Sequence, residues 1–168
     1  MPHKVVIIDD DANIRNIFKK LIEKAGYEAI PVERAEEAID LSKHQKVAVY
    51  VVDYQLPGMN GEEFIERHDL GTSVAFMVTA AEVTQEFMAR LFSKGMVFVI
   101  KKPIVPQMFM VCISRAVSLH ILLETNKQQK EVIEETAQIS DDVSGMLEGV
   151  VKSIKGVVEG KDDSILSS

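Results

Sequence analysis

The stretch Val47-Ala-Val-Tyr-Val-Val-Asp53-Tyr-Gln-Leu-Pro-Gly-Met-Asn-Gly61 decides the fold of this chain. An uncharged apolar run rich in β-branched residues stops at Asp53, and two turn pairs, Pro57-Gly58 and Asn60-Gly61, follow at once. This pattern predicts a buried strand over residues 47–52 that delivers Asp53 to its carboxyl end and then breaks into a loop. A carboxylate at such an edge either initiates a turn or takes part in chemistry, and the rest of the chain has to distinguish the two roles.

The composition indicates one domain with an appendage, because the 168 residues are 46% hydrophobic and can bury a sizeable core. The net charge is −7, with 26 acidic and 19 basic residues and no basic block, so we expect no direct binding to DNA. The single cysteine, Cys112, excludes an internal disulfide and fits a reducing cytoplasm, and we expect it to be a small buried side chain. We expect no segment long and apolar enough to span a bilayer, and therefore a cytoplasmic protein without a membrane partner.

Apolar runs and helical spacing alternate through the first hundred residues. The expected strands are 4–8, 27–32, 47–52, 74–78 and 96–100, and the expected helices are 12–25, 34–44, 61–68 and 82–93. The helical spacing places Ile17 and Phe92 among the buried residues. This alternation predicts an α/β fold, a parallel sheet with helices on both of its faces, and a site where the strands reach their carboxyl ends.

The pattern changes after Pro106. Residues 108–135 are expected to form one helix with a break or bend near Ser140-Asp141-Asp142, and a second run over 143–158 carries apolar residues at steps of three and four. We therefore divide the chain into a domain over 1–120 and a helical extension over 121–168. The apolar stripe needs a partner surface, and a homodimer through these C-terminal helices is the interpretation we prefer. Two others remain open: a helix folded back on the domain, or a linker to an output domain, since Gly149–Asp163 faintly resembles the lead-in to an HD-type phosphohydrolase domain.

Polar side chains stand at the carboxyl ends of four expected strands: Asp9-Asp10, Asp53, Thr79 and Lys102-Pro103. If these strands are neighbours, the groups converge on one small surface. Crowded carboxylates repel one another and become tolerable around a hard divalent cation such as Mg²⁺. A carboxylate nucleophile, a metal site, a hydroxyl and an ammonium group together are the equipment of phosphoryl transfer.

From about Lys4 to His120 the chain resembles the receiver domain of two-component response regulators. The residues that carry the match are Ile-Ile-Asp9-Asp10, Val-Val-Asp53 with Leu-Pro-Gly-Met-Asn-Gly61, Val-Thr79-Ala, and Lys102-Pro103, in the expected order and spacing. The resemblance implies a flavodoxin-like, doubly wound five-stranded parallel sheet in the order 2-1-3-4-5. It implies a phosphorylation-dependent switch rather than an enzyme, with a sensor histidine kinase or a phosphotransfer protein as partner.

The resemblance also implies a role for each site residue. Asp53 would be the phosphoacceptor, and Mg²⁺ (or Mn²⁺) would be held by Asp10, by Asp53 and by the backbone carbonyl of Gln55, with Asp9 acting through water. Thr79 and Lys102 would stabilise the phosphoryl group. Asp11 stands at a position that family members fill variably and is left out of the site, and Lys101 is the less suitable of the two lysines.

The chain departs from the family at one position. Receivers commonly carry an aromatic switch residue three positions before the site lysine, and Val99 stands there in this sequence. Phe98 is one position away, so it should face the opposite side of the sheet. The usual coupling between Thr79 and an aromatic ring is therefore altered or absent.

The same residues are compatible with other interpretations. Asp9-x-Asp11 after an apolar strand resembles the nucleophile motif of haloacid-dehalogenase-type phosphohydrolases, although Asn13 stands where that motif has a threonine. A receiver that docks without being phosphorylated is a further possibility. Taken alone, Asp9 and Asp10 could be a helix N-cap. The four histidines share no spacing suited to a metal site, so we expect them on the solvated surface.

Overall fold

The computed structural model describes residues 1–162, which fall into two compact units, Met1–Glu124 and a second unit that begins at Thr125. The first unit holds a parallel sheet and all of its covering helices. The strands are β1 (Lys4–Ile8), β2 (Glu28–Val32), β3 (Val49–Asp53), β4 (Val74–Thr79) and β5 (Met96–Lys101). They lie in the order β2-β1-β3-β4-β5, with every neighbouring pair parallel, which confirms the predicted topology.

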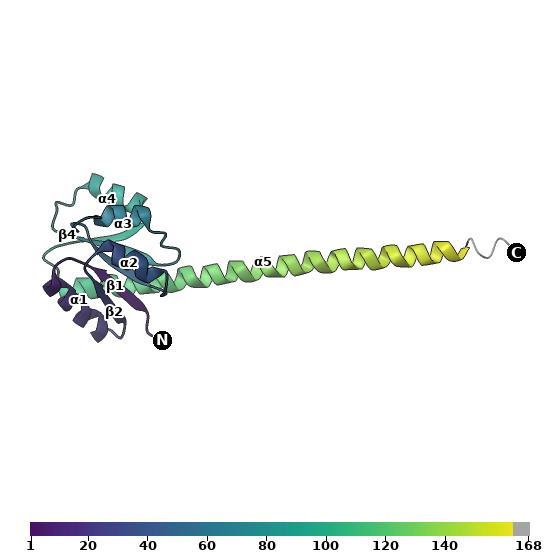
Figure 1. Cartoon of the computed structure of the whole chain (residues 1–168), viewed down its shortest axis with the longest axis horizontal. Coiled ribbons are helices and arrows are strands. Elements are labelled where there is room, and N and C mark those ends of the chain that lie inside the picture. The colour runs from purple at the N-terminus through teal and green to yellow at the C-terminus, as the bar shows by residue number, and fades with distance from the viewer. Residues whose placement is uncertain (163–168) are drawn as a thin grey trace. The chain divides into compact units, whose positions relative to one another are not determined.

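Helices cover both faces of the sheet, as the alternation predicts. The helices are α1 (Ala12–Lys24), α2 (Ala35–Ser42), α3 (Gly61–Arg67), α4 (Gln85–Ser93) and α5 (Pro106–Asp162). Within the first unit, α1 and the start of α5 lie on one face, and α2, α3 and α4 lie on the other (Figure 1). Every residue of β3 and β4 is buried, because these two central strands are covered on both sides.

Two hydrophobic clusters, one on each face, hold the layers together. On the α1 and α5 face, the ring of Phe109 stacks on Phe18 at 4.3 Å and meets Phe76 edge-on. Cys112 is buried in the same cluster, as predicted, and burial raises the pKa of its thiol. On the other face, Phe64 and Leu91 pack against the sheet.

Capping side chains fix where the helices begin. The carboxylate of Asp11 accepts hydrogen bonds from the backbone N–H groups of Asn13 and Ile14 and so begins α1. Asn60 and Glu63 form a reciprocal capping box at the start of α3. The hydroxyl of Thr84 caps α4, which therefore begins at Gln85 and not at the predicted residue 82.

Two residues predicted to be buried are exposed. Ile17 is 51% exposed and Phe92 is 42% exposed. Each stands at the edge of its apolar stripe, where the sequence spacing fits but the sheet no longer covers the side chain, since Phe18 and Leu91 already fill the central positions.

The expected break in the long helix is absent, because α5 runs without interruption through Ser140–Asp142. None of these three residues is proline or glycine, and a serine or an aspartate in an exposed helical position costs only a few tenths of a kcal/mol, roughly, relative to better helix formers. The side-chain amide of Gln138 also donates a hydrogen bond to Asp142 one turn later. Polar composition alone is therefore a poor predictor of a helix break.

The helix also corrects our expectation about membranes. Over Pro106–Gly156 it contains an 18-residue window with a mean hydropathy of 1.5, and by length and composition alone it could cross a membrane. A third of that window is buried within the protein, and Phe109, Ile113 and Ala116 near its start are core residues. A core helix meets the same criterion, so this window is weak evidence for a membrane span.

One of the four histidines, His120, is buried, contrary to the prediction, and two more, His3 and His68, are partly buried. His120 is 5% exposed, and its Nδ1 lies 2.8 Å from the carbonyl oxygen of Thr72. Glu124, one turn later, accepts from the Thr72 hydroxyl and pairs with Lys46. These contacts attach α5 to the amino-terminal edge of the sheet, and they join residues too far apart in sequence for any local pattern to reveal.

His68 is half-buried beside two aromatic rings. Its Nε2 lies 3.1 Å from the hydroxyl of Tyr50, and its ring packs against Tyr50 and Phe64. Burial lowers the pKa of His68 below its ordinary value of 6.5, although the charge of Asp69 acts in the opposite direction. Burial also raises the pKa of the Tyr50 hydroxyl to about 12.

This burial predicts a pH dependence of stability. Because folding lowers the pKa of His68, the unfolded chain binds more protons than the folded protein as the pH falls below 6.5, and the free energy of unfolding should decrease there. Urea unfolding between pH 7.5 and pH 5, run as buffered steps of about half a unit, measures the slope. The variant His68→Gln should show a shallower loss, and an unchanged slope would exclude this origin.

Candidate functional site

The polar residues predicted to converge do meet at the carboxyl edge of the sheet. Asp53 is the last residue of β3 and Thr79 the last of β4, while Asp9 and Lys102 directly follow β1 and β5. Because β1, β3, β4 and β5 are consecutive parallel neighbours, all four residues arrive at the same edge. The lysine here is Lys102, as expected, and not Lys101.

The ammonium group of Lys102 bridges two buried carboxylates. Its Nζ lies 2.7 Å from Asp53 Oδ2 and 3.2 Å from Asp9 Oδ2, and the two aspartates are only 5% and 1% exposed. Burial alone would lower the pKa of Lys102, but the hydrogen bond with Asp53 and the charges of both aspartates outweigh it and raise the pKa. Lys102 is therefore held as a cation between the acids.

The surroundings of Asp9 disfavour its charged form. Burial raises its pKa and the charge of Asp53 raises it further, whereas a hydrogen bond from the backbone N–H of Asp11 and the neighbouring Lys102 lower it. The net effect is an increase in the pKa of Asp9. One ammonium group does not balance the acids gathered here, so the site favours a further cation.

Three carboxylates form a group suited to a hard metal ion. Oxygen atoms of Asp9, Asp10 and Asp53 all lie within 4.8 Å of one another, and Asp10 is exposed while the other two are buried. An all-oxygen donor set with one open side matches the preference of Mg²⁺, which keeps several of its waters. The residues present therefore fit such an ion.

Thr79 and Gln55 each form one hydrogen bond at the site. The hydroxyl of Thr79, which is fully buried, accepts from the backbone N–H of Ala81 at 2.9 Å. The backbone N–H of Gln55 donates to Asp53 Oδ1 at 3.1 Å. Asp53 thus initiates a turn and also contacts Lys102, so a turn-forming carboxylate and a site carboxylate are the same residue. The roles of Thr79 and of the Gln55 carbonyl with a phosphoryl group stay predictions.

Two residues near the site were not identified from the sequence. Asp11, one position after the acidic pair, is the N-cap of α1, so the capping role that Asp9 and Asp10 could have had if taken alone belongs to their neighbour. Arg15, in the first turns of α1, donates from its guanidinium to the backbone carbonyl of Asp9 at 2.6 Å. No spacing signals this contact, because Arg15 and Asp9 are six residues apart, outside the steps of three and four that bring side chains together on a helix.

The same contacts weaken the dehalogenase interpretation. That motif needs a reactive first acid and a second acid two residues later. Asp9 is 1% exposed and held by Lys102, and Asp11 is occupied with the N–H groups of Asn13 and Ile14. The two acids of the motif therefore do not point to a shared reaction centre.

Gly61 packs closely against the end of β3 that carries Asp53. A Cβ added at Gly61 would lie 2.6 Å from the backbone oxygen of Asp53 and 2.8 Å from the sulfur of Met77. The backbone N–H of Gly61 also donates to the carbonyl of Tyr54. Any side chain at this position would displace the strand end that carries Asp53.

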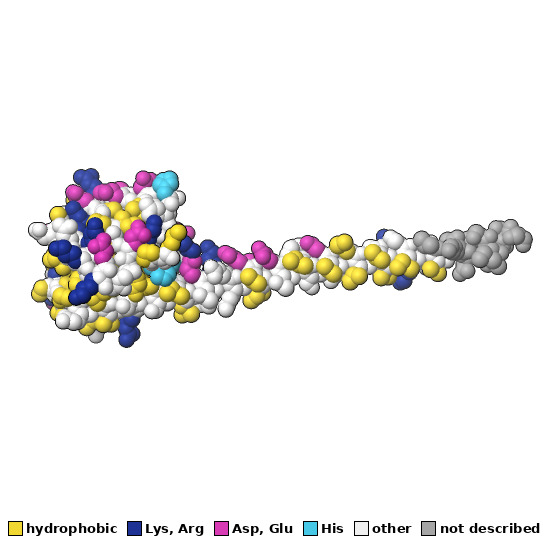
Figure 2. Space-filling model, turned by 90° about the horizontal axis from the view of Figure 1, so that it is seen from below, with side chains coloured by type: hydrophobic (Ala, Val, Ile, Leu, Met, Phe, Trp, Pro, Cys, Tyr) yellow, Lys and Arg dark blue, Asp and Glu magenta, His cyan; other side chains and the backbone are white. Residues whose placement is uncertain are grey.

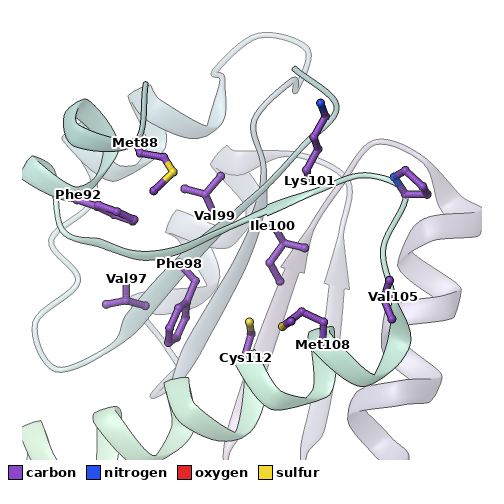
Figure 3. A pocket seen from close by; sticks show the side chains of 11 residues that line it. Met88, Phe92, Val97, Phe98, Val99, Ile100, Lys101, Val105, Met108 and Cys112 are labelled. Atoms are coloured by element: carbon purple, nitrogen blue, oxygen red, sulfur yellow. The ribbon is translucent and has the colours of Figure 1, made fainter. Parts of the chain in front are cut away.

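A hydrophobic groove lies beside the site, between α4, β5 and the start of α5. Its volume is about 540 Å³. Val99 lines it near Met88 of α4, whereas Phe98 points toward α5 and packs on Phe76, so the two face opposite sides as predicted (Figure 3). The lining residues of the groove are Met88, Phe92, Val97, Phe98, Val99, Ile100, Lys101, Pro103, Val105, Met108 and Cys112.

Comparisons with known proteins agree with this geometry. Residues 5–114 match the family model described as the response regulator receiver domain. A cyclic di-GMP phosphodiesterase of Thermotoga maritima is 29% identical over 143 residues, covering 80% of this chain and 38% of that protein. The polar-differentiation response regulator DivK of Brucella anthropi is 36% identical over 63 residues, covering 38% of this chain and 51% of DivK. The chain thus spans no more than about half the length of these relatives.

Solved structures show the same fold. A CheY-like receiver domain protein from Methanospirillum hungatei superposes with a TM-score of 0.66 and 25% identity, covering 71% of this chain and 97% of that one. The chemotaxis protein CheY4 of Vibrio cholerae gives a TM-score of 0.64 at 23% identity, with 69% and 99% covered. With the family model matched over well more than half of its length, this chain belongs to the response regulator receiver domain family.

Proposed function

We propose that this protein is a phosphorylation-dependent switch of a two-component system that accepts a phosphoryl group on Asp53. The observation that carries the proposal is the contact between Lys102 and the buried Asp53, with Asp9 and Asp10 alongside. The phosphoryl group comes from a sensor histidine kinase or a phosphotransfer protein in the cytoplasm, or from a small acyl phosphate. The aspartate motifs, the fold and the family membership all support this reading.

The two oxygens of Asp53 are held by different groups, which orients the carboxylate. Oδ1 accepts from the Gln55 N–H and Oδ2 from the Lys102 ammonium. A carboxylate oxygen attacks the phosphorus of the donor, and the bond from phosphorus to the donor atom breaks as the new P–O bond forms. Lys102 stabilises the negative charge that this transfer brings into a buried site.

Mg²⁺, or Mn²⁺, completes the site in this proposal. Asp10 and Asp53 would hold the ion directly, the backbone carbonyl of Gln55 would be a third ligand, and Asp9 would act through water. When bound, the ion neutralises charge on the phosphoryl oxygens during the transfer. The open side of the cluster at Asp10 supports this assignment, because the other acids are already engaged by Lys102.

Metal binding is testable without phosphorylation. Millimolar Mg²⁺ should raise the unfolding temperature, since a ligand that binds only the folded state stabilises it by about 1–3 kcal/mol at ~10–100 times its dissociation constant. Differential scanning calorimetry should show that Asp10→Asn loses this increase. Asp11→Asn makes the same change of charge one residue away and preserves a good N-cap, so it should keep the increase. Equal losses in the two variants would contradict the assignment.

Phosphorylation would change the surface next to α4 through Thr79. Its hydroxyl now accepts from the N–H of Ala81, in the segment that leads to α4. Turning that hydroxyl to donate to a phosphoryl oxygen releases the Ala81 N–H and frees the segment to move. Since Val99 supplies no aromatic ring to follow Thr79, the proposed response is a rearrangement of this segment and of the adjoining groove.

The direct test of the function is covalent labelling. The purified protein, incubated with acetyl phosphate and Mg²⁺, should gain the mass of one phosphoryl group in intact-mass spectrometry. Chelating the metal with EDTA should prevent the gain. Absence of any adduct with acetyl phosphate and with several histidine kinases would leave the docking-only interpretation in its place.

We also propose that this chain is a switch and not itself an enzyme. The relative named as a cyclic di-GMP phosphodiesterase aligns over 80% of the chain, which extends past the family match and supports a linker role for the second unit in a protein of that kind. Among the described residues, one group of acids is suited to a metal, and it is the receiver site. We therefore expect no hydrolysis of cyclic di-GMP by the purified chain in a chromatographic assay. Metal-dependent product formation would overturn this expectation.

A further inference from the structure

The second unit carries an apolar stripe that the chain itself leaves uncovered. Residues 125–156 and Val158 are all exposed, although many of them are aliphatic. Figure 2 shows hydrophobic side chains following one side of this helix, with acidic side chains on another. A helix with four glycines in its last two dozen residues gains little from propensity and needs burial of this stripe for stability.

The stripe repeats every eleven residues. Val132, Val143 and Ile154 are eleven apart, as are Thr136, Leu147 and Val158, and as are Ile139 and Val150. All of these positions except Thr136 are aliphatic, and the exposed fractions of the aliphatic ones lie between 49% and 62%. From Val132 the chain reaches Thr136, Ile139 and Val143 in steps of four, three and four residues. These eleven residues make about three turns of a helix, so the positions lie on one side of it and form a straight seam.

The repeat is also visible as similarity between two segments. Val-Ser-Gly-Met-Leu-Glu-Gly over 143–149 aligns with Ile-Lys-Gly-Val-Val-Glu-Gly over 154–160. The repeated glycines fall on the side of the helix away from the seam, and a Cβ at Gly145, Gly149 or Gly156 would meet nothing within 4 Å. The spacing of eleven is therefore present on both faces of the helix in these two segments.

We infer that residues 132–158 pair with the same segment of a second copy of this chain, parallel and in register, along this eleven-residue seam. In a two-fold symmetric pair, each apolar residue of the seam faces the equivalent residue of the other copy, so the same pattern buries the seam of both chains. An eleven-residue period predicts a pair that is nearly straight or coils with a right hand, unlike the left-handed coil of a seven-residue period. The inference depends on the second unit and not on the role of Asp53.

The flanks of the seam favour the parallel arrangement. Toward the C-terminus, Met146 and Val151 widen the apolar face, and both are exposed. Toward the N-terminus, the positions eleven residues earlier are Glu135 and Ser140, and Ile133 is the exposed aliphatic residue beside the seam. In a parallel pair, the broader apolar face near the C-terminus of one helix meets the same face of the other helix. In an antiparallel pair, Glu135 would lie against apolar side chains and would lose its hydration, which costs free energy.

The composition disfavours a lipid surface as the occupant. Residues 125–156 hold four lysines against six acidic residues and no aromatic side chain. Helices that lie on membranes usually carry an excess of Lys and Arg on the polar side and Trp, Phe or Leu on the other. A second copy of the chain, with the same aliphatic seam, is the partner of matching chemistry.

The first test is the mass of the full chain in solution. Light scattering coupled to size-exclusion chromatography should give twice the monomer mass of 18.7 kDa at micromolar concentration. Val143→Glu with Leu147→Glu should weaken the dimer by at least about 100-fold, because both charges enter the seam. The matched control, Gly145→Glu with Gly149→Glu, adds the same charges at the same spacing on the outer side and should remain dimeric. A monomeric wild type, a trimer, or equal losses in both variants would overturn the inference.

The second test resolves orientation and register. Val132→Cys should form a disulfide-linked dimer on mild oxidation, because in a parallel pair the two residues are opposite each other. In an antiparallel pair Val132 would face Val158, about 39 Å away along a helix rising 1.5 Å per residue. Glu134→Cys, on the outer side, is the control and should not link. A disulfide between Val132→Cys and Val158→Cys in a mixture of the two variants would reject the parallel pairing. Wild-type protein that stays monomeric and sediments with phosphatidylglycerol vesicles would also reject it.

Discussion

Replacing Asp53 by Asn is expected to abolish phosphorylation by acetyl phosphate, with a loss of about 100-fold or more in the labelling rate. The amide of asparagine keeps the size of the side chain and removes the nucleophilic carboxylate oxygen. It also removes one of the two acids that share Lys102. Intact-mass spectrometry of the wild type and the variant under the same donor concentration measures the difference.

The stability of this variant separates chemistry from folding. Asp53→Asn removes a buried negative charge that faces Asp9, so the metal-free protein should unfold at the same or a higher temperature than the wild type. Asp11→Asn is the matched control, since it changes the same charge at the N-cap and should label normally. Labelling that persists in Asp53→Asn would place the phosphoacceptor elsewhere, with Asp9 the first alternative.

Replacing Gly61 by Ala is expected to lower the free energy of unfolding of the receiver by about 1–3 kcal/mol. The new Cβ would lie 2.6 Å from the Asp53 backbone oxygen and 2.8 Å from the Met77 sulfur. Met77 can turn away, but the backbone of β3 has to move. Because that movement shifts Asp53 relative to Lys102, the labelling rate should fall as well. Urea unfolding followed by circular dichroism, together with the labelling assay, measures both effects.

The control for Gly61→Ala is a glycine with open space around it. At Gly145 an added Cβ meets nothing within 4 Å, and alanine is the better helix former. Gly145→Ala should therefore leave the unfolding of the receiver unchanged. If Gly61→Ala were as harmless as Gly145→Ala, the close approach of α3 to the end of β3 would not constrain the site.

Much of the fold could be predicted because its signals are local. Each strand is a short apolar run, and Asp53 stands out as the first charge after an uncharged strand. The parallel order brings Asp9, Asp53, Thr79 and Lys102 to one edge, so the site residues could be named from the ends of strands. The opposite directions of Phe98 and Val99 follow from the alternation of side chains along β5.

What escaped prediction depends on contacts that no local pattern encodes. Asp9, Asp10 and Asp11 are the same residue type, and only the path of the backbone makes the third one the helix cap. His120 is buried because Thr72, far away in sequence, offers its carbonyl oxygen. Phe92 is exposed because Leu91 already fills the place under α4. Helix α5 continues through two aspartates because exposed polar residues cost a helix little.

The sharing of Lys102 between Asp9 and Asp53 has a consequence for the design of permanently active variants. Replacing Asp53 by glutamate keeps the single negative charge at this position and leaves Lys102 with two acids. An aspartyl phosphate carries about −1.5 to −2 charges in place of the single charge of Asp53, with three acceptor oxygens on phosphorus that a carboxylate does not supply. A better mimic would also release the ammonium group from its second acid, for example by combining Asp53→Glu with Asp9→Asn.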